Sequence, residues 1–61
     1  MRVSELKRLL LAHDCYELSH GKEHDVWYST VTKAKIRVPR HQNKEVPYGT
    51  LNSILKQAGI K

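Results

Sequence analysis

The chain has 61 residues, and its 11 Lys and Arg outnumber its 6 Asp and Glu, which leaves a formal net charge of +5. We expect residues 1–61 to make one domain with a modest core, because a domain of about 60 residues buries only ~60% of its unfolded surface. The single cysteine excludes an internal disulfide framework, and no apolar run approaches the ~20 residues of a membrane span. We expect a cytoplasmic protein without a secretory leader, whose basic excess attracts either nucleic acid or an acidic protein.

The first predicted element is a helix close to the N-terminus. The residues that recur at helical spacing on its apolar side are Leu6, Leu9, Leu10 and His13. Its polar side carries Arg2, Lys7 and Arg8. Ser4 is the predicted N-cap, because its hydroxyl can accept a hydrogen bond from the free N–H groups of the first turn. We expect the helix to end near His13 or Asp14.

Three short strands are predicted next, over residues 15–19, 25–29 and 35–38. The second is rich in β-forming side chains, and the third alternates charged and apolar residues as a half-buried strand does. Gly21 marks the first turn and residues 30–33 form the second. Pro39 ends the last strand, because it has no N–H to donate to a neighbour.

The closing helix has the clearest pattern. Its apolar stripe, at spacing i, i+3, i+4 and i+7, consists of Leu51, Ile54, Leu55 and Ala58. We expect it to begin either with Pro47 in its first turn or with Thr50 as its cap. Gly59 suits the left-handed conformation that follows a helix, and Ile60 can fold back on Leu55 to close it.

These elements predict an α+β domain of two layers in the order α-β-β-β-α. Both helices cover one face of an antiparallel three-stranded sheet. The other face stays open and is edged by basic residues. This open face is where we expect a partner to bind.

Histidine is the side chain best suited to proton transfer near neutral pH, and the chain has four: His13, His20, His24 and His41. His24 is the strongest candidate, because it lies between the turn at Gly21 and the predicted strand at residues 25–29. The alternative is an ordinary surface histidine at a turn. His41 becomes a second proton-transfer group if its loop folds back toward His24.

A zinc site is not favoured, although His20 and His24 with Cys15 or Asp25 offer ligand atoms. Structural zinc is usually held by paired Cys or His at short spacings, and this sequence has no such pairs. We therefore predict chemistry without a metal or other cofactor.

Basic side chains gather between the first turn and the final loop, where they can contact phosphates. They are Lys22, Lys33, Lys35, Arg37, Arg40 and Lys44. Trp27 and Tyr28 alternate across the second strand, so we expect Trp27 in the core and Tyr28 on the open face, where it can stack on a base. A carboxylate from Glu23 or Asp25, on either side of His24, would favour its imidazolium form.

Several stretches together point to a known family. They are Ser4-Glu5-Leu6 with Leu9-Leu10, His24 followed by an aromatic residue at Trp27, Val38-Pro39-Arg40-His41, and the closing stretch at residues 49–60. In these stretches the chain resembles the HicA toxins. The likeness covers essentially the whole chain, and the closing stretch is its most specific part.

This resemblance implies a fold like that of a double-stranded-RNA-binding domain and a ribosome-independent endonuclease that cuts mRNA. It also implies a partner, the HicB antitoxin, which holds the toxin inactive. The family's catalytic histidine follows Gly-Ser at the start of the second strand, and by position that residue is His24. Lys22 and Glu23 stand here in place of Gly-Ser, with Gly21 one residue early. Lys22 can supply a cation where glycine would expose backbone amides to phosphate.

We therefore predict a slow, metal-independent endoribonuclease in which His24 acts as general base or acid. The predicted RNA contacts are Lys22, Tyr28, Lys35, Arg37, Arg40, His41 and Lys44. Two other functions fit the same fold and charge: an RNA-binding module without activity, and a domain that binds only an acidic protein.

Overall fold

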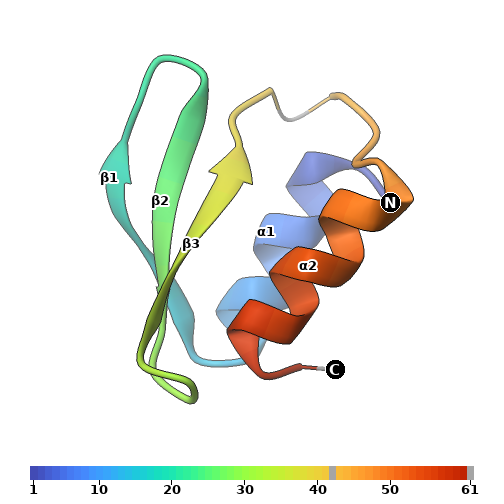
Figure 1. Ribbon diagram of the computed structural model, residues 1–61. Coiled ribbons are helices and arrows are strands. Elements are labelled where there is room, and N and C mark those ends of the chain that lie inside the picture. The colour runs from blue at the N-terminus through green and yellow to red at the C-terminus, as the bar shows by residue number, and fades with distance from the viewer. Residues whose placement is uncertain (42, 61) are drawn as a thin grey trace.

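The computed structural model describes residues 1–41 and 43–60, and it has the predicted order of elements (Figure 1). The elements are α1 (Val3–Ala12), β1 (Cys15–His20), β2 (His24–Ser29), β3 (Ala34–Pro39) and α2 (Tyr48–Ala58). Each strand is six residues long, so it extends the predicted one by a residue or two. Within the described ranges, no helix is long and apolar enough to cross a membrane.

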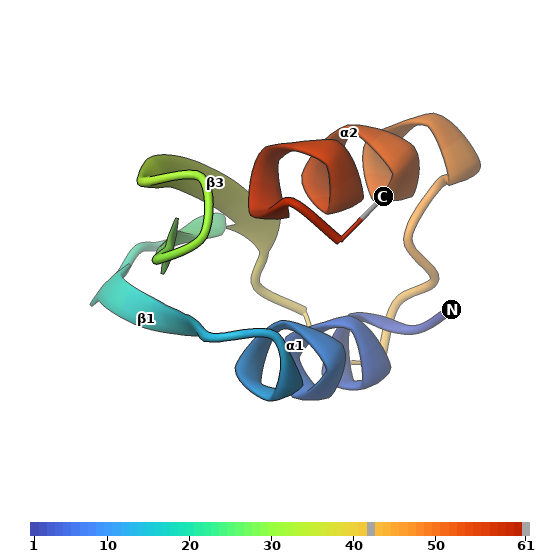
Figure 2. The ribbon, with the colours of Figure 1, turned by 90° about the horizontal axis from the view of Figure 1, so that it is seen from below.

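The strands form an antiparallel sheet in the order β1-β2-β3. Both helices lie on the same side of this sheet, as Figure 2 shows when the molecule is seen along the sheet. α1 packs against β1, while α2 packs against β3 and β2. The predicted α+β architecture with one covered and one open face is therefore confirmed.

The core lies between the sheet and the two helices. Its buried residues are Val3, Leu6, Leu10, Cys15, Trp27, Ile36, Val38, Val46, Ile54 and Ala58. Trp27 is the largest of them and occupies the core position predicted for it, in a chain that has no Phe. Leu51, Leu55 and Ile60 pack against this cluster from its edge, which completes the predicted stripe of α2.

The start of α1 differs from the prediction, while α2 starts next to one of its two predicted positions. α1 begins at Val3 with Arg2 at the N-cap, and the N–H of Arg2 donates to the Glu5 carboxylate at 3.1 Å. Ser4 was expected at this cap but lies inside the first turn, because Val3 is itself fully buried and is drawn into the helix. Of the two predicted starts of α2, the structure has the one near Pro47, which is the N-cap, and Thr50 lies inside the helix.

The end of α2 is closed as predicted. Gly59 adopts a left-handed conformation with φ of 79°, and its N–H donates to the Lys56 carbonyl at 3.1 Å. The N–H of Ile60 then reaches back to the Leu55 carbonyl at 3.0 Å. This pair of hydrogen bonds satisfies carbonyls that the helix end leaves without partners.

Candidate functional site

His24 begins β2 and lies on the open side of the sheet. It pairs in register with Pro39 of β3, and its side chain is exposed. Side chains alternate along a strand, so His24, Val26 and Tyr28 face away from the helices while the buried Asp25 and Trp27 face them. Within residues 1–41 and 43–60, no hydrogen bond or ion pair engages the His24 imidazole.

The turn before His24 is tight and depends on glycine. A Cβ atom added at Gly21 would lie 2.3 Å from the His24 carbonyl oxygen, a distance that real side chains do not tolerate. Gly21 therefore lets β1 and β2 approach closely, and the turn that presents His24 is compact.

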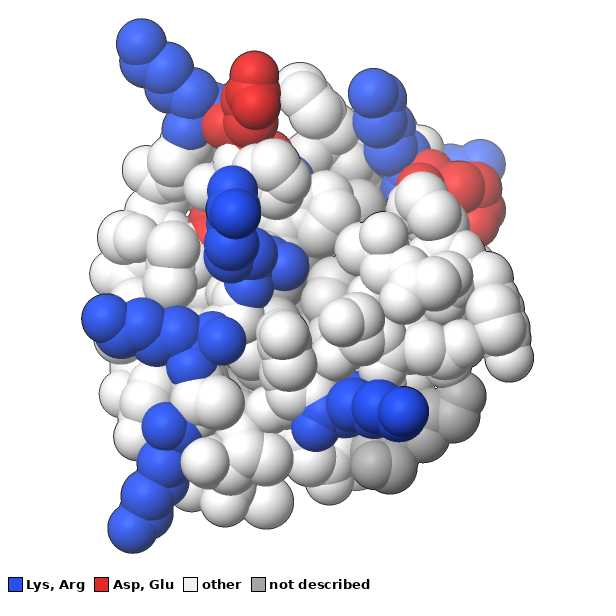
Figure 3. Space-filling view, viewed as in Figure 1, with Lys and Arg blue, Asp and Glu red and all other residues white. Residues whose placement is uncertain are grey.

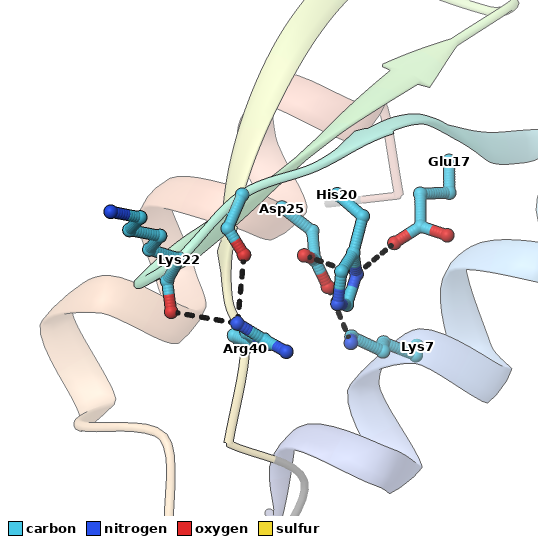
Figure 4. A network of polar contacts seen from close by, with 7 residues as sticks. Lys7, Glu17, His20, Lys22, Asp25 and Arg40 are labelled. Carbon is cyan, nitrogen blue, oxygen red and sulfur yellow. Dashed lines mark hydrogen bonds and ion pairs between the residues drawn. The ribbon is translucent and has the colours of Figure 1, made fainter.

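Arg40 fastens this turn to the end of β3 (Figure 4). Its Nη1 donates to the carbonyl oxygens of Gly21 at 3.2 Å and Lys22 at 3.1 Å, and its backbone N–H donates to the Glu23 carbonyl at 3.3 Å. Arg40 was predicted to contact phosphate. Its contacts bring it to the turn that carries His24 and commit part of its guanidinium to holding that turn.

Two further predicted RNA contacts lie on β3. Lys35 and Arg37 are exposed, and they pair in register with Tyr28 and Val26 of the open face. Figure 3 shows basic side chains spread over the visible strands and α2, whereas the acidic ones in this view lie in its upper half. Lys35 and Arg37 therefore lie beside the open-face residues of β2, which are His24, Val26 and Tyr28.

Tyr28 lies on the open side of the sheet, as predicted from the alternation. It is half-buried, and its ring centroid lies 5.6 Å from that of the exposed Tyr16 on β1, at an interplanar angle of 52°. The two residues are also register partners in the sheet. This tilted aromatic pair offers a surface on which a base can stack.

The remaining two predicted contacts, His41 and Lys44, lie in the loop after β3. His41 is exposed and directly follows Arg40, and its carbonyl accepts the N–H of Lys44 at 3.1 Å. The Lys44 carbonyl in turn accepts the N–H of Val3 at 3.0 Å, which places Lys44 at the start of α1. His41 thus stays near the clamped turn, while Lys44 belongs to the edge of the helix layer.

A polar network that the sequence did not reveal lies on the helix side of the same turn (Figure 4). The Asp25 side chain is fully buried, and its Oδ2 accepts a hydrogen bond from Lys7 Nζ at 2.7 Å. Its Oδ1 lies 2.9 Å from His20 Nδ1, which is also 3.4 Å from Glu17 Oε1. Asp25 had been a candidate for tuning His24, but its contacts are with Lys7 and His20, on the opposite face.

Burial alone would raise the pKa of Asp25. The hydrogen bond and positive charge of Lys7, together with His20 and Glu17, outweigh that cost and hold the pKa below its ordinary value of 3.8. Asp25 is therefore an ionised carboxylate at neutral pH. Its strand position could have revealed this buried carboxylate. Asp25 is two residues from Trp27 on the same strand, so both face the core, where a charged group requires a partner.

This network also bears on metal binding. Glu17, His20 and Asp25 offer ligand atoms that all lie within 4.8 Å of one another. His24 and Cys15, which had been weighed as zinc ligands, are not in this group: His24 faces the other side of the sheet, and Cys15 is buried. A divalent ion at the group would meet the Lys7 ammonium, which already neutralises Asp25.

Residues 3–60 match the family model described as the HicA toxin of bacterial toxin–antitoxin systems. The chain belongs to the HicA toxin family. Neither a search of curated proteins nor one of solved structures gave a match. The family match spans all five elements of this HicA chain, including the turn at His24 and the β3 end clamped by Arg40.

Proposed function

We propose that this HicA toxin is an endoribonuclease that cleaves mRNA in the cytoplasm, without a metal ion, through His24. The observation that carries the proposal is the position of His24: exposed and free of partners within the described ranges, at a turn held by Gly21 and Arg40. A proton-transfer group needs this combination of fixed backbone and accessible imidazole. The family membership supports the toxin role.

In the proposed reaction, His24 takes the proton of a ribose 2′-hydroxyl. The 2′-oxygen attacks the adjacent phosphorus, the bond to the 5′-oxygen of the next nucleotide breaks, and that oxygen takes a proton from His41 or from water. The products are a 2′,3′-cyclic phosphate and a free 5′-hydroxyl. Lys22, Arg37 and the guanidinium of Arg40 counter the charge that develops on the phosphate oxygens.

One well-placed histidine predicts a slow enzyme, because a second proton-transfer group typically contributes ~10²–10⁴-fold. His41 is the candidate for that second role, since it follows Arg40 at the clamped turn. A HicB-type antitoxin completes the proposal, and we expect it to cover His24 and the open face. Such a partner would also stabilise a domain as small as this one through binding.

The test is cleavage of a long purified mRNA by the wild type and by His24→Ala, both in the presence of EDTA. Fragments from the wild type alone support the proposal. Equal fragments from both proteins would assign cleavage to another residue or to a contaminant. Intact RNA with both folded proteins would favour the module without activity if RNA still binds. If RNA does not bind at moderate salt, the domain that meets only an acidic protein is favoured.

A further inference from the structure

A groove with a volume of about 350 Å³ lies between β3 and α2. Its lining residues are Lys35, Arg37, Thr50, Ser53, Ile54 and Gln57. β3 is an edge strand of the sheet, so this groove opens along the sheet's border, beside α2. No acidic side chain is among the described residues that line it.

The two walls of the groove have different chemistry. The β3 wall is formed by Lys35 and Arg37, two exposed basic residues that are two positions apart on one strand and therefore ~6.6 Å apart along it. The α2 wall provides Thr50, Ser53 and Gln57, whose spacing of three and four residues puts them on one stripe of the helix. Hydroxyl and amide groups both donate and accept hydrogen bonds, so this stripe can bind phosphate and sugar oxygens beside the cations.

Beyond the groove, β3 continues to the register partner of His24. Lys35, Arg37 and Pro39 alternate along β3, and Pro39 is the register partner of His24. Arg37 is two residues from Pro39, which corresponds to ~6.6 Å along the strand. A chain that follows β3 past Arg37 therefore reaches the strand position that pairs with His24.

We propose that the groove between β3 and α2 binds the phosphodiester backbone of a single RNA strand on one side of the bond to be cut. The inference rests on the proposed cleavage at His24 for its direction, and it adds α2 to the substrate-binding surface. Double-stranded-RNA-binding domains contact ~16 base pairs across two minor grooves. A groove of about 350 Å³ beside one edge strand fits one backbone instead.

The experiment measures binding of a fluorescent single-stranded 2′-O-methyl RNA 12-mer, which cannot be cut by attack of a 2′-hydroxyl. Its affinity is followed as the salt concentration rises, for the wild type, Lys35→Gln, Arg37→Gln and Lys56→Gln. Lys56 is the matched control, because it neighbours Gln57 on α2 but does not line the groove. All three variants lose the same charge.

Each lost phosphate contact should reduce the slope of log affinity against log salt by ~0.7 for a single strand. We expect this change for Lys35→Gln and for Arg37→Gln, and a clearly smaller one for Lys56→Gln. Ser53→Ala and Thr50→Val should weaken binding several-fold and leave the slope unchanged, since they remove hydrogen bonds and no charge. Circular dichroism and thermal melting establish that each variant is folded.

Equal slope changes in all three charge variants would overturn the inference, because the groove would then contribute only general electrostatics. The inference would also be overturned if an unlabelled RNA duplex of the same length displaced the probe as strongly as an unlabelled single strand does. If the groove variants bound RNA as the wild type does but no longer bound a co-expressed antitoxin, the groove would be a protein interface. Since the probe cannot be cleaved, these results are independent of the mRNA test of His24, and either proposal can fail alone.

Discussion

Replacing Lys7 by Met removes the ammonium that neutralises the buried Asp25 and keeps most of the aliphatic stem. Breaking a buried ion pair costs ~3–5 kcal/mol, whereas an exposed pair contributes ~0–1 kcal/mol. The Asp25 side chain is 0% exposed and that of Lys7 14%, but His20 remains 2.9 Å from Asp25 and is 56% exposed. The cost of Lys7→Met should fall between these two limits, and we expect a loss of ~2 kcal/mol in the free energy of unfolding.

In a domain of this size, 1 kcal/mol corresponds to ~4–8 °C in Tm, so Lys7→Met should melt ~8–16 °C below the wild type at pH 7. Arg8→Met is the control, because Arg8 is an exposed neighbour on the same helix, and it should change Tm little. The difference should depend on pH. The lowered pKa of Asp25 contributes stability that is present above its ordinary value of 3.8 and is lost as pH falls through the folded-state pKa.

The Tm difference between Lys7→Met and the wild type should therefore shrink in strongly acidic solution, where Asp25 is protonated in both proteins. Thermal melts followed by circular dichroism, from pH 7 down into strongly acidic solution, test both parts. A difference in Tm below ~3 °C at pH 7 would refute the role assigned to the Lys7–Asp25 pair.

Gly21→Ala forces a Cβ against the His24 carbonyl, so we expect it to cost ~1–3 kcal/mol and to lower cleavage as well; an unchanged melt would contradict the tight turn. Ser29→Ala removes the buried hydrogen bond from Ser29 Oγ to the Ala58 carbonyl at 2.8 Å, and chemical denaturation should show a loss of ~1–3 kcal/mol. Arg40→Lys keeps the charge but loses the paired contacts to the turn, so cleavage should fall while the salt dependence of RNA binding changes little. If the slope of log affinity against log salt fell as much as in Arg37→Gln, Arg40 would instead be mainly a phosphate contact.

Periodicity was sufficient for the order of elements and for the faces of β2, because alternation alone separates Trp27 from Tyr28 and His24 from Asp25. The polar network required more than periodicity. Glu17 and His20 are three residues apart, which in a regular strand puts them on opposite faces. The pairing of β1 with β2 shifts between Glu17 and Ser19, and this bulge brings both side chains to the helix side. No local pattern in the sequence marks such a shift.

The helix starts show a related limit. Ser4 is the better cap by side-chain chemistry, but Val3 is fully buried and Arg2 forms a bridge with Glu45, forty-three positions later in the chain. Burial of one valine and a contact between distant segments outweigh a capping preference of ~1 kcal/mol. The same kind of contact places Arg40 against the β1–β2 turn. Sequence placed Arg40 among the phosphate contacts, but its clamping of the turn depends on the tertiary structure.

Two histidines flank the β1–β2 turn, and their surroundings distinguish their roles. His20 has Nδ1 between the carboxylates of Asp25 and Glu17, so that nitrogen is engaged in the network that joins β1, β2 and α1. His24 has no such contact within the described ranges and offers both ring nitrogens to a substrate on the open face. We therefore expect His20→Gln to lower Tm and retain cleavage, and His24→Gln to retain Tm and lower cleavage by ~10²-fold or more.

The opposite outcome has a definite physical meaning. An imidazole whose Nδ1 meets a buried carboxylate is the arrangement by which enzymes orient a general base, with Nε2 left for the substrate. Loss of cleavage in His20→Gln, with cleavage retained in His24→Gln, would move the catalytic centre to the helix side of the turn. Lys7, which donates to the same Asp25 carboxylate that His20 contacts, would then supply a cation at that centre, and the β3–α2 groove would no longer lie beside the bond that is cut.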